Sequence, residues 1–483
     1  MNLDETVLDE KLAELEAVQT WSPRLIARLE ALLRGDDERK LVHLNPLAFA
    51  KEQRLNEAEV IDLFLHAAKR GLLELEWRVI CPACALALES FGALKHVDHR
   101  LYCEICHVAV EVKLDDYIQV CFTVSPRARR LAWHDPSRLS AREELFQYRF
   151  CAEARLPDGG LLRDMFAATV PICERLEPRR TRHLELELCD GFLSGADPVS
   201  HADFLLTVSG EKTDRVQPLT LTLEQGRYRV ESPALRPGPA RLEVRNASDR
   251  WGTLLLSTVA AGSPGLPKAT FSPFLTGGRA LSHQTFRRLF RSEVIHASEG
   301  IGVREATLLF TDLQGSTALY EKIGDLAAFG LVRQHFERLA EVVQAFDGAV
   351  VKTIGDAVMA VFHDPARAFA AAAKMLEAID AFNREHGAEA VVLKVGLHRG
   401  STIAVTLNET ADYFGQTVNV AARVQGLAQG QEICFTDAIA EVAGVSELLR
   451  GFEVRPRDEK LKGVERQVRV FAARRSDASA VAA

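Results

Sequence analysis

Residues 304–475 follow an order of strands and helices that few folds accommodate. The apolar stretch "EATLLFTD" precedes two helices, the strands "AVVKTIG" and "DAVMAVF", and the helix "PARAFAAAAKMLEAIDAFNREHG". Two strands, "VVLKVGLHRG" and "STIAVTL", then a helix "VNVAARVQGLA" and a strand "EICFT" complete the series. This order contains the split βαβ unit, so we expect an α+β, ferredoxin-like domain over 304–475.

The longer of the first two helices, "LAAFGLVRQHFERLAEVVQAF", carries an apolar residue every three or four positions. Such spacing is typical of a helix with one buried stripe. The residues that we expect to be buried are Leu326, Phe329, Val332, Phe336, Leu339, Val343 and Phe346.

Two carboxylates end apolar strands of this domain. Asp356 lies at a Gly-Asp hairpin tip in "VVKTIGDAVMAVF", and Asp312 ends the first strand in "LLFTDLQGST". In a split βαβ sheet the first strand and this hairpin are neighbours, so we expect both side chains at one edge. Paired carboxylates there suit Mg²⁺ or Mn²⁺. The alternative is that Asp312 only caps the following helix.

The segment after Asp312 predicts a phosphate site. The residues "QGST" open a helix, whose free N–H groups and dipole attract anions. The candidate phosphate-binding residues are Gln314, Gly315, Ser316 and Thr317.

A second polar set lies in "DYFGQTVNVAARV". Asn419 and Arg423 are four apart on a predicted helix, so they share a face. An amide and a guanidinium on one face suit a phosphoryl group that gains charge during a reaction. The alternative is a solvated helix face, although the flanking apolar residues favour a packed helix.

The three motifs together resemble the catalytic domain of class III nucleotidyl cyclases, in order and separation, over about 170 residues. The resemblance implies cyclisation of ATP or GTP, with release of pyrophosphate, at two Mg²⁺ or Mn²⁺ ions per active site. It implies that Asp312 and Asp356 hold the metals, that Asn419 positions the ribose, and that Arg423 stabilises the transition state. Within the same family, Lys352 and Asp412 resemble the pair that selects the base.

This pair favours adenine, which offers an amino donor beside a ring-nitrogen acceptor. Asp412 and Lys352 supply the matching acceptor and donor, whereas guanine places a carbonyl where adenine has the amino group. We therefore expect an adenylate cyclase; a guanylate cyclase and a catalytically silent nucleotide-sensing regulator are the alternatives.

The family also implies a head-to-tail homodimer, because the two metal aspartates and the remaining site residues come from different subunits. This sequence differs from the family pattern at the position of the lysine that binds the triphosphate. Lys462 in "EKLKGVERQVRV" is the candidate, but Val464 falls close to where that lysine can lie, and Arg466 or Lys460 could substitute.

Further upstream, two C-x-x-C pairs, Cys81/Cys84 and Cys103/Cys106, are separated by 18 residues. Two such pairs supply four thiolates to a tetrahedral Zn²⁺, and four sulfurs close its coordination sphere, so we expect a structural zinc site. Four free buried thiols, or a redox pair, are the alternatives. His96, His99 and His107 lie nearby, and one of them could replace a cysteine as ligand.

The remaining sequence predicts several further parts. We expect N-terminal helices over 1–40, a winged-helix-like segment with the zinc ribbon over 41–110, an α+β region over 111–185, and a small antiparallel β-sandwich over 186–262. A linker over 263–303, with a short amphipathic helix in "LSHQTFRRLFRSEVI", precedes the cyclase domain, and 476–483 are expected to be disordered.

The helix-turn-helix order in 41–110 raises DNA binding as a possibility. The second helix opens with Glu57, Glu59 and Asp62, where a phosphate-facing helix would carry Lys or Arg. The net charge of −8 also argues against a binder of phosphate backbones. We therefore expect a packing or dimerisation module there. A zinc-containing transcription factor fused to a cyclase is the alternative.

The first residues of this 483-residue sequence are acidic and lack an apolar core, so we expect no signal peptide there; no apolar run is long enough to span a membrane. Its nine cysteines do not form a disulfide framework, so we expect a cytoplasmic protein. We expect residues 1–300 to be a sensory or regulatory region in which the zinc module and the sandwich position the dimer; binding of an unknown regulatory ligand or protein there is the alternative.

Overall fold

The computed structural model describes residues 3–18, 21–97, 100–135, 138–263, 267–291, 300–386, 391–407 and 410–476. His99, residues 264–266 and 292–299 of the predicted linker, and residues 477–483 of the predicted tail lie outside the described residues. None of the helices in the described ranges combines the length and apolar character that crossing a membrane requires. The chain forms two compact units: Met1–Gly92, Asp98–Val112 and Tyr117–Leu275 in the first, and Ala93–Val97, Lys113–Asp116 and Thr276–Ala483 in the second.

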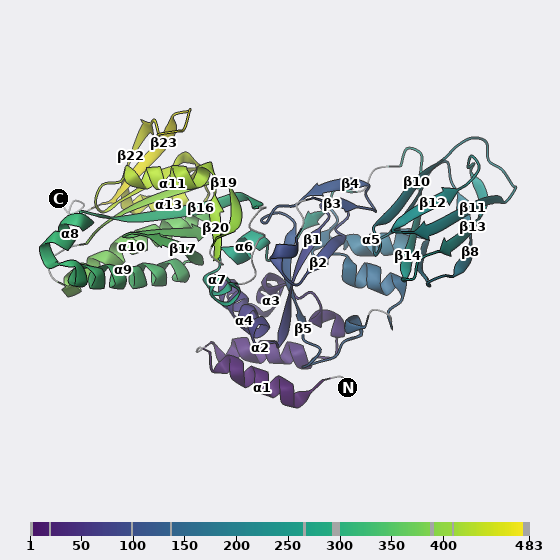
Figure 1. The fold of residues 1–483 in the computed structure, drawn as a ribbon, viewed down its shortest axis with the longest axis horizontal. Coiled ribbons are helices and arrows are strands. Elements are labelled where there is room, and N and C mark those ends of the chain that lie inside the picture. Colours follow the sequence, from purple (N-terminus) through teal and green to yellow (C-terminus); the bar gives the residue numbers. More distant parts are fainter. Residues whose placement is uncertain are drawn as a thin grey trace. The chain divides into compact units, whose positions relative to one another are not determined.

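Four helices and a three-stranded sheet begin the first unit (Figure 1). Asp4, Asn45 and Asn56 cap three of the helices with side-chain oxygens that accept backbone N–H groups. The helices are α1 (Glu5–Glu16), α2 (Pro23–Arg34), α3 (Pro46–Gln53) and α4 (Glu57–Lys69). The sheet has the order β2 (Ala87–Phe91), β1 (Leu73–Ile80), β5 (Ile118–Val124). Its third strand therefore lies beyond the predicted boundary at residue 110.

Two four-stranded sheets share one apolar core in the second half of this unit. One sheet has the order β10 (Ala202–Val208), β9 (Gly191–Asp197), β14 (Gly252–Ala260), β7 (Ile172–Leu176). The other has the order β12 (Arg227–Glu231), β11 (Gln217–Glu224), β13 (Gly238–Asn246), β8 (Thr181–Leu188).

Two details of the predicted sandwich are wrong. Its first strands, β7 and β8, begin before residue 186. The sandwich is also not wholly antiparallel, because β11 and β13 pair in parallel. Strand alternation indicates which face is buried but not which strand lies alongside, so the sequence could not show this pairing.

Shorter elements connect these layers. They are β3 (Arg100–Cys103), β4 (Val108–Glu111), β6 (Ala154–Arg155), β15 (Thr270–Phe271), α5 (Leu162–Thr169) and a π-helix (Glu143–Arg149).

The second unit is built on one large sheet (Figure 1). The sheet has the order β17 (Gly348–Ile354), β18 (Ala357–Phe362), β16 (Ile301–Gln314), β19 (Val392–Leu407), β21 (Glu432–Thr436), β23 (Val468–Arg475), β22 (Phe452–Glu459), and β20 (Thr410–Phe414) pairs with β19. The helices are α6 (Gly277–Leu281), α7 (Gln284–Leu289), α8 (Ser316–Ile323), α9 (Asp325–Ala345), α10 (Pro365–His386), α11 (Gln416–Gly426), α12 (Asp437–Ala440) and α13 (Val445–Leu448).

Strand β16 lies between β18 and β19, which confirms the predicted split βαβ order. Helices α9 and α10 cover one face of the sheet and α11 packs against the other (Figure 1). Leu309, Leu313, Leu393 and Val395 join the core with α9 and α10. Since side chains alternate along a strand, Asp312 and Lys394 lie on the opposite face.

The sequence predicted two strands where β19 is continuous from Val392 to Leu407. Gly396 and Gly400, which lie within this strand, allow α11 to approach it. A Cβ at Gly400 would lie 2.7 Å from the Thr417 hydroxyl, and one at Gly396 would lie 2.3 Å from the backbone of Gln425. These glycines therefore position α11, the helix of Asn419 and Arg423.

The predicted stripe of the long helix is only partly confirmed. Val332, Leu339 and Val343 are buried in α9. In contrast, Leu326 is 87% exposed and Phe329 is 60% exposed, so the described residues leave these two side chains uncovered.

Candidate active site

Asp356 lies in the two-residue turn between β17 and β18, where Gly355 adopts a φ of 62°. Phe310 pairs with Met359 across β16 and β18, so the same register carries Asp312 alongside Ala357, the neighbour of Asp356. The structure thus brings the two predicted metal ligands to one end of adjacent strands. The Oδ2 atom of Asp356 is buried without a hydrogen-bond partner among the described residues. An unpaired carboxylate oxygen beside a second carboxylate fits a hard divalent cation.

Asp312 is not a helix cap. It lies within β16, and its carboxylate forms an ion pair of 2.6 Å with Lys394 on the neighbouring strand. The cap position of α8 is occupied by Gly315, with a φ of 76° and no side-chain hydrogen bond. Lys394 was not among the residues predicted from the sequence, although a lysine inside the apolar run "VVLKVGL" carries the same signal as Lys352.

The predicted phosphate segment has the expected local form. Helix α8 begins at Ser316, directly after Gly315, and Gln314 is exposed at the end of β16. The side chain of Thr317 lies outside the described part of the chain. Backbone N–H groups in the first turn of a helix point along the helix axis out of its N-terminal end, so those of α8 can donate hydrogen bonds to a phosphate near Asp312.

Lys352 and Asp412 form a direct ion pair, with 2.6 Å between Nζ and Oδ2. The Asp412 side chain is buried, and its Oδ1 accepts a hydrogen bond of 2.8 Å from the Tyr413 N–H. The Lys352 ammonium also lies 5.8 Å from the centre of the Phe414 ring. The predicted base-selecting pair therefore meets within one chain, although 60 residues separate its members.

Asn419 and Arg423 both lie on α11, one turn apart. Asn419 is exposed, and Arg423 is partly buried with its guanidinium beside Gly463. A Cβ at Gly463 would lie 3.6 Å from both terminal nitrogens of Arg423. Lys462 is exposed and adjacent to this glycine, whereas Val464 is buried in an apolar cluster. Of these two positions, therefore, only Lys462 presents an exposed cation.

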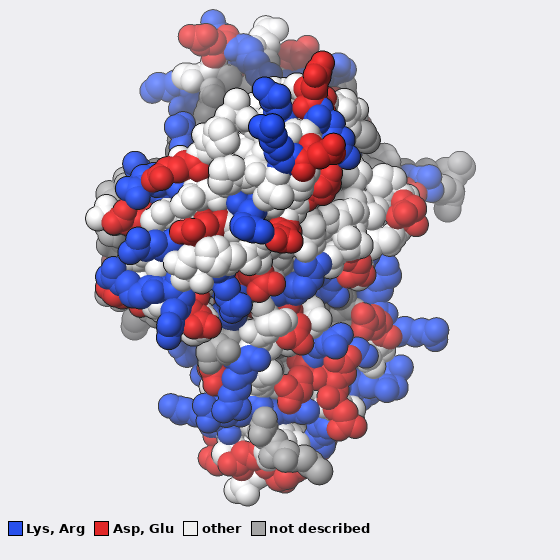
Figure 2. Space-filling view, turned by 90° about the vertical axis from the view of Figure 1, so that its right-hand side faces the viewer, with Lys and Arg blue, Asp and Glu red and all other residues white. Residues whose placement is uncertain are grey.

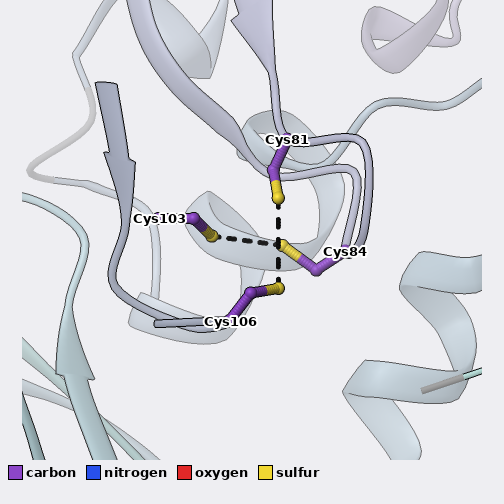
Figure 3. Close-up of side chains that lie close together, drawn as sticks. All are labelled: Cys81, Cys84, Cys103 and Cys106. Carbon is purple, nitrogen blue, oxygen red and sulfur yellow. Dashed lines mark hydrogen bonds between the residues drawn. The ribbon is translucent and has the colours of Figure 1, made fainter. Parts of the chain in front are cut away.

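The four predicted zinc ligands also meet, in the first unit. Their sulfur atoms point toward one another and all lie within 4.8 Å (Figure 3). The Cys81–Cys106 distance is 3.9 Å and the Cys84–Cys103 distance is 3.6 Å. Tetrahedral zinc with Zn–S bonds of about 2.3 Å places sulfurs about 3.8 Å apart, so this cluster fits the ion.

Each cysteine pair forms the same tight loop. The residue after the second cysteine has a positive φ in both, 65° at Ala85 and 54° at His107. Non-glycine residues rarely adopt this conformation, so its repetition indicates that the two cysteine pairs form equivalent loops. His107 does not compete as a ligand, because its two ring nitrogens contact Asp203 and Ser194. His96 is exposed.

The fold and these motifs define the class of the second unit. Residues 302–472 match the family model described as "Adenylate and Guanylate cyclase catalytic domain". This part of the chain is therefore a class III cyclase catalytic domain, as the sequence motifs implied.

The preceding residues, 8–288, match a "Family of unknown function (DUF5939)". This match covers more than half of the chain, so the protein belongs to that family. Because the family has no assigned function, the match neither supports nor opposes a zinc site.

The chain resembles several curated proteins. It is 28% identical over 266 residues to the "pH-sensitive adenylate cyclase MT1302" of Mycobacterium tuberculosis, covering 53% of this chain and 60% of the relative. It is 29% identical over 185 residues to an "Adenylate cyclase" of Anabaena cylindrica, covering 35% and 36%. It is 37% identical over 209 residues to the "Uncharacterized protein Rv2212" of M. tuberculosis, covering 42% and 50%. The match thus spans 60% or less of the length of each of these relatives.

Solved structures of cyclases resemble about a third of the chain. The adenylyl cyclase CyaB from P. aeruginosa has 19% identity and a TM-score of 0.32, covering 37% of this chain and 98% of that one. The guanylyl cyclase Cya2 has 20% identity and a TM-score of 0.33, covering 37% and 96%.

Proposed function

We propose that the protein is an adenylate cyclase that converts ATP to 3′,5′-cyclic AMP and pyrophosphate. The observation that carries the proposal is the Lys352–Asp412 pair, a donor and an acceptor held together at 2.6 Å. Asp412 accepts from the adenine amino group and Lys352 donates to the ring nitrogen beside it. Guanine would leave both partners mispaired, which costs binding energy at each of them.

The remaining site residues would bind the metal ions, the ribose and the phosphates. Asp312 and Asp356 would hold two Mg²⁺ or Mn²⁺ ions, which supply Lewis acidity toward the 3′-hydroxyl and neutralise charge on the triphosphate. Asn419 orients the ribose, and Arg423 balances the charge that grows on the α-phosphate. Lys462, Lys394 and the start of α8 bind the other phosphate oxygens.

The active unit in this proposal is a head-to-tail homodimer, in which α11 of one subunit faces the two aspartates of the other. Four apolar side chains near these motifs are between 45% and 52% exposed: Ile354, Ile403, Leu407 and Phe414. Two of them, Ile403 and Phe414, line a cavity of about 920 Å³ beside α11. Exposed apolar surface around a site is typical of a subunit interface.

The first unit acts, in this proposal, as a cytoplasmic regulatory region with a structural zinc ion on Cys81, Cys84, Cys103 and Cys106. Four thiolates leave the metal no open position for a substrate. On the face drawn in Figure 2, acidic and basic side chains of the described residues are interspersed. A nucleic acid would instead require a concentrated basic surface.

A nucleotide assay tests the base preference. With Mn²⁺ and equal nucleotide concentrations, we expect kcat/KM for ATP to exceed that for GTP by about tenfold or more, because guanine mispairs with two polar groups. Lys352→Glu should lower kcat/KM for ATP by about a hundredfold and abolish the preference. Cyclic nucleotides and pyrophosphate are measured after chromatographic separation.

Lys374→Glu is the matched control, since it makes the same charge change on the exposed side of α10. It should leave both rates unchanged. Turnover of GTP alone would identify a guanylate cyclase instead. Tight nucleotide binding without any product, at several pH values and with both metals, would identify a silent nucleotide sensor.

A further inference from the structure

Helix α7 contacts both strands that carry the base-selecting pair. Gln284 and Arg287 are three residues apart on this helix, so they share a face. The Gln284 Oε1 atom accepts a hydrogen bond of 2.8 Å from the Val350 N–H on β17. The Arg287 guanidinium donates to the carbonyl oxygen of Ala411 on β20.

The contact at Val350 lies at a β-bulge. Val350 pairs with Ala360, a core residue beneath α9 and α10, whereas Lys352 pairs with Met359, which points to the other face. In a regular strand residues 350 and 352 would point the same way, so the bulge turns Lys352 toward Asp412. Gln284 satisfies the backbone group at this irregular position and thereby stabilises the orientation of Lys352.

The contact at Ala411 lies directly before Asp412. Strand β20 pairs only with β19 among the described strands, so its outer edge depends on other support. Arg287 provides that support by binding the Ala411 carbonyl oxygen, and its charge also acts on Asp412. The same helix residue therefore contacts the backbone directly before Asp412 and places a positive charge near its carboxylate, the group that would accept a hydrogen bond from the adenine amino group.

We propose that α7 positions the base-recognition pair and that Gln284 and Arg287 are positioning residues for nucleotide selection. Each acts on the backbone one or two residues before Lys352 or Asp412. Both lie within residues 8–288, the match to the family of unknown function. The last helix of that region thus contributes to the site of the following domain. The proposal rests on the proposed function, because it concerns the same base pocket.

The test uses the full chain and compares ATP with GTP. Arg287→Ala should reduce the ratio of the two kcat/KM values by about tenfold, mainly through a higher KM for ATP. Arg287→Lys retains a cation and should keep most of the ratio. Gln284→Ala should reduce the ratio severalfold. Arg291→Ala, an exposed arginine four residues further on, is the matched control and should change nothing.

A second measurement does not depend on turnover. Hydrogen exchange of the peptide containing Thr410–Phe414 should be faster in Arg287→Ala than in the wild type, because the edge strand loses its outer contact. If the wild type cyclises neither nucleotide, the proposed function fails, while faster exchange still supports the positioning role of Arg287.

Three results would overturn the proposal. One is an unchanged ATP:GTP ratio in both Arg287→Ala and Gln284→Ala. Another is an equal loss of activity toward both nucleotides with a lower melting temperature, since this indicates a general structural role. The third is unchanged exchange in β20. If Arg287→Ala fails to fold, the test uses the ATP:GTP ratio of kcat/KM in Arg287→Lys and Gln284→Ala. A wild-type ratio in both variants would overturn the proposal.

Discussion

Asp356→Asn is expected to lower the rate of cyclic AMP formation by roughly a thousandfold or more, because a metal ion contributes several kcal/mol to such a reaction. The substitution keeps the shape of the side chain and removes its charge. The Asp356 Oδ2 atom has no hydrogen-bond partner among the described residues, so folding does not depend on a contact that asparagine would lose. The rate is measured under saturating ATP and Mn²⁺.

The same variant should bind Mn²⁺ weakly in the presence of a non-reactive ATP analogue, while its melting temperature stays close to that of the wild type. Asp325→Asn, an exposed aspartate in the first turn of α9, is the matched control and should retain full activity. Near-normal turnover by Asp356→Asn would exclude Asp356 as a metal ligand. Asp312→Asn is a less clean test, because it also removes the partner of Lys394.

Cys81→Ser is expected to lower the zinc content from about one ion per chain to nearly none, and to destabilise the first unit by about 3 kcal/mol or more. The reason is that the ion joins two cysteine pairs separated by 18 residues, and three thiolates bind it much less tightly than four. Metal analysis and calorimetry measure the two effects. Since the chain has two compact units, the thermal unfolding transition of the second unit should change little.

Cys189→Ser serves as the control, because Cys189 is a free cysteine outside the cluster. It should change neither zinc content nor stability. If Cys81→Ser also left both unchanged, the four sulfurs would be buried thiols and the zinc assignment would be wrong.

Local signals in the sequence were sufficient to predict the strand order and many of the candidate site residues of the second unit. Asp312, Asp356 and Lys352 are charged residues inside or beside apolar strands, and such a placement is costly without a partner. The split βαβ order then determines which strands are neighbours. Lys394 meets the same criterion and could have been found in this way.

Other features depend on tertiary contacts that no local pattern encodes. Gly400 resembles a turn residue in the sequence, yet it lies inside β19 because α11 needs space there. Leu326 and Phe329 follow the helical period of the buried residues, but both remain exposed among the residues that the structure describes. Gln284 and Arg287 look like ordinary polar residues of a linker helix, because their partners are backbone groups more than sixty residues away.

Restoration of activity by mixing two inactive variants tests the shared active site most directly. Asp356→Asn damages the metal side and Arg423→Ala damages the α11 side, so each homodimer alone should be inactive. In a head-to-tail homodimer, random exchange of subunits places one intact site in half of the dimers and restores about a quarter of wild-type activity with ATP. If the mixture stays inactive after exchange has been verified, or if a monomer cyclises ATP, the two-subunit site is contradicted.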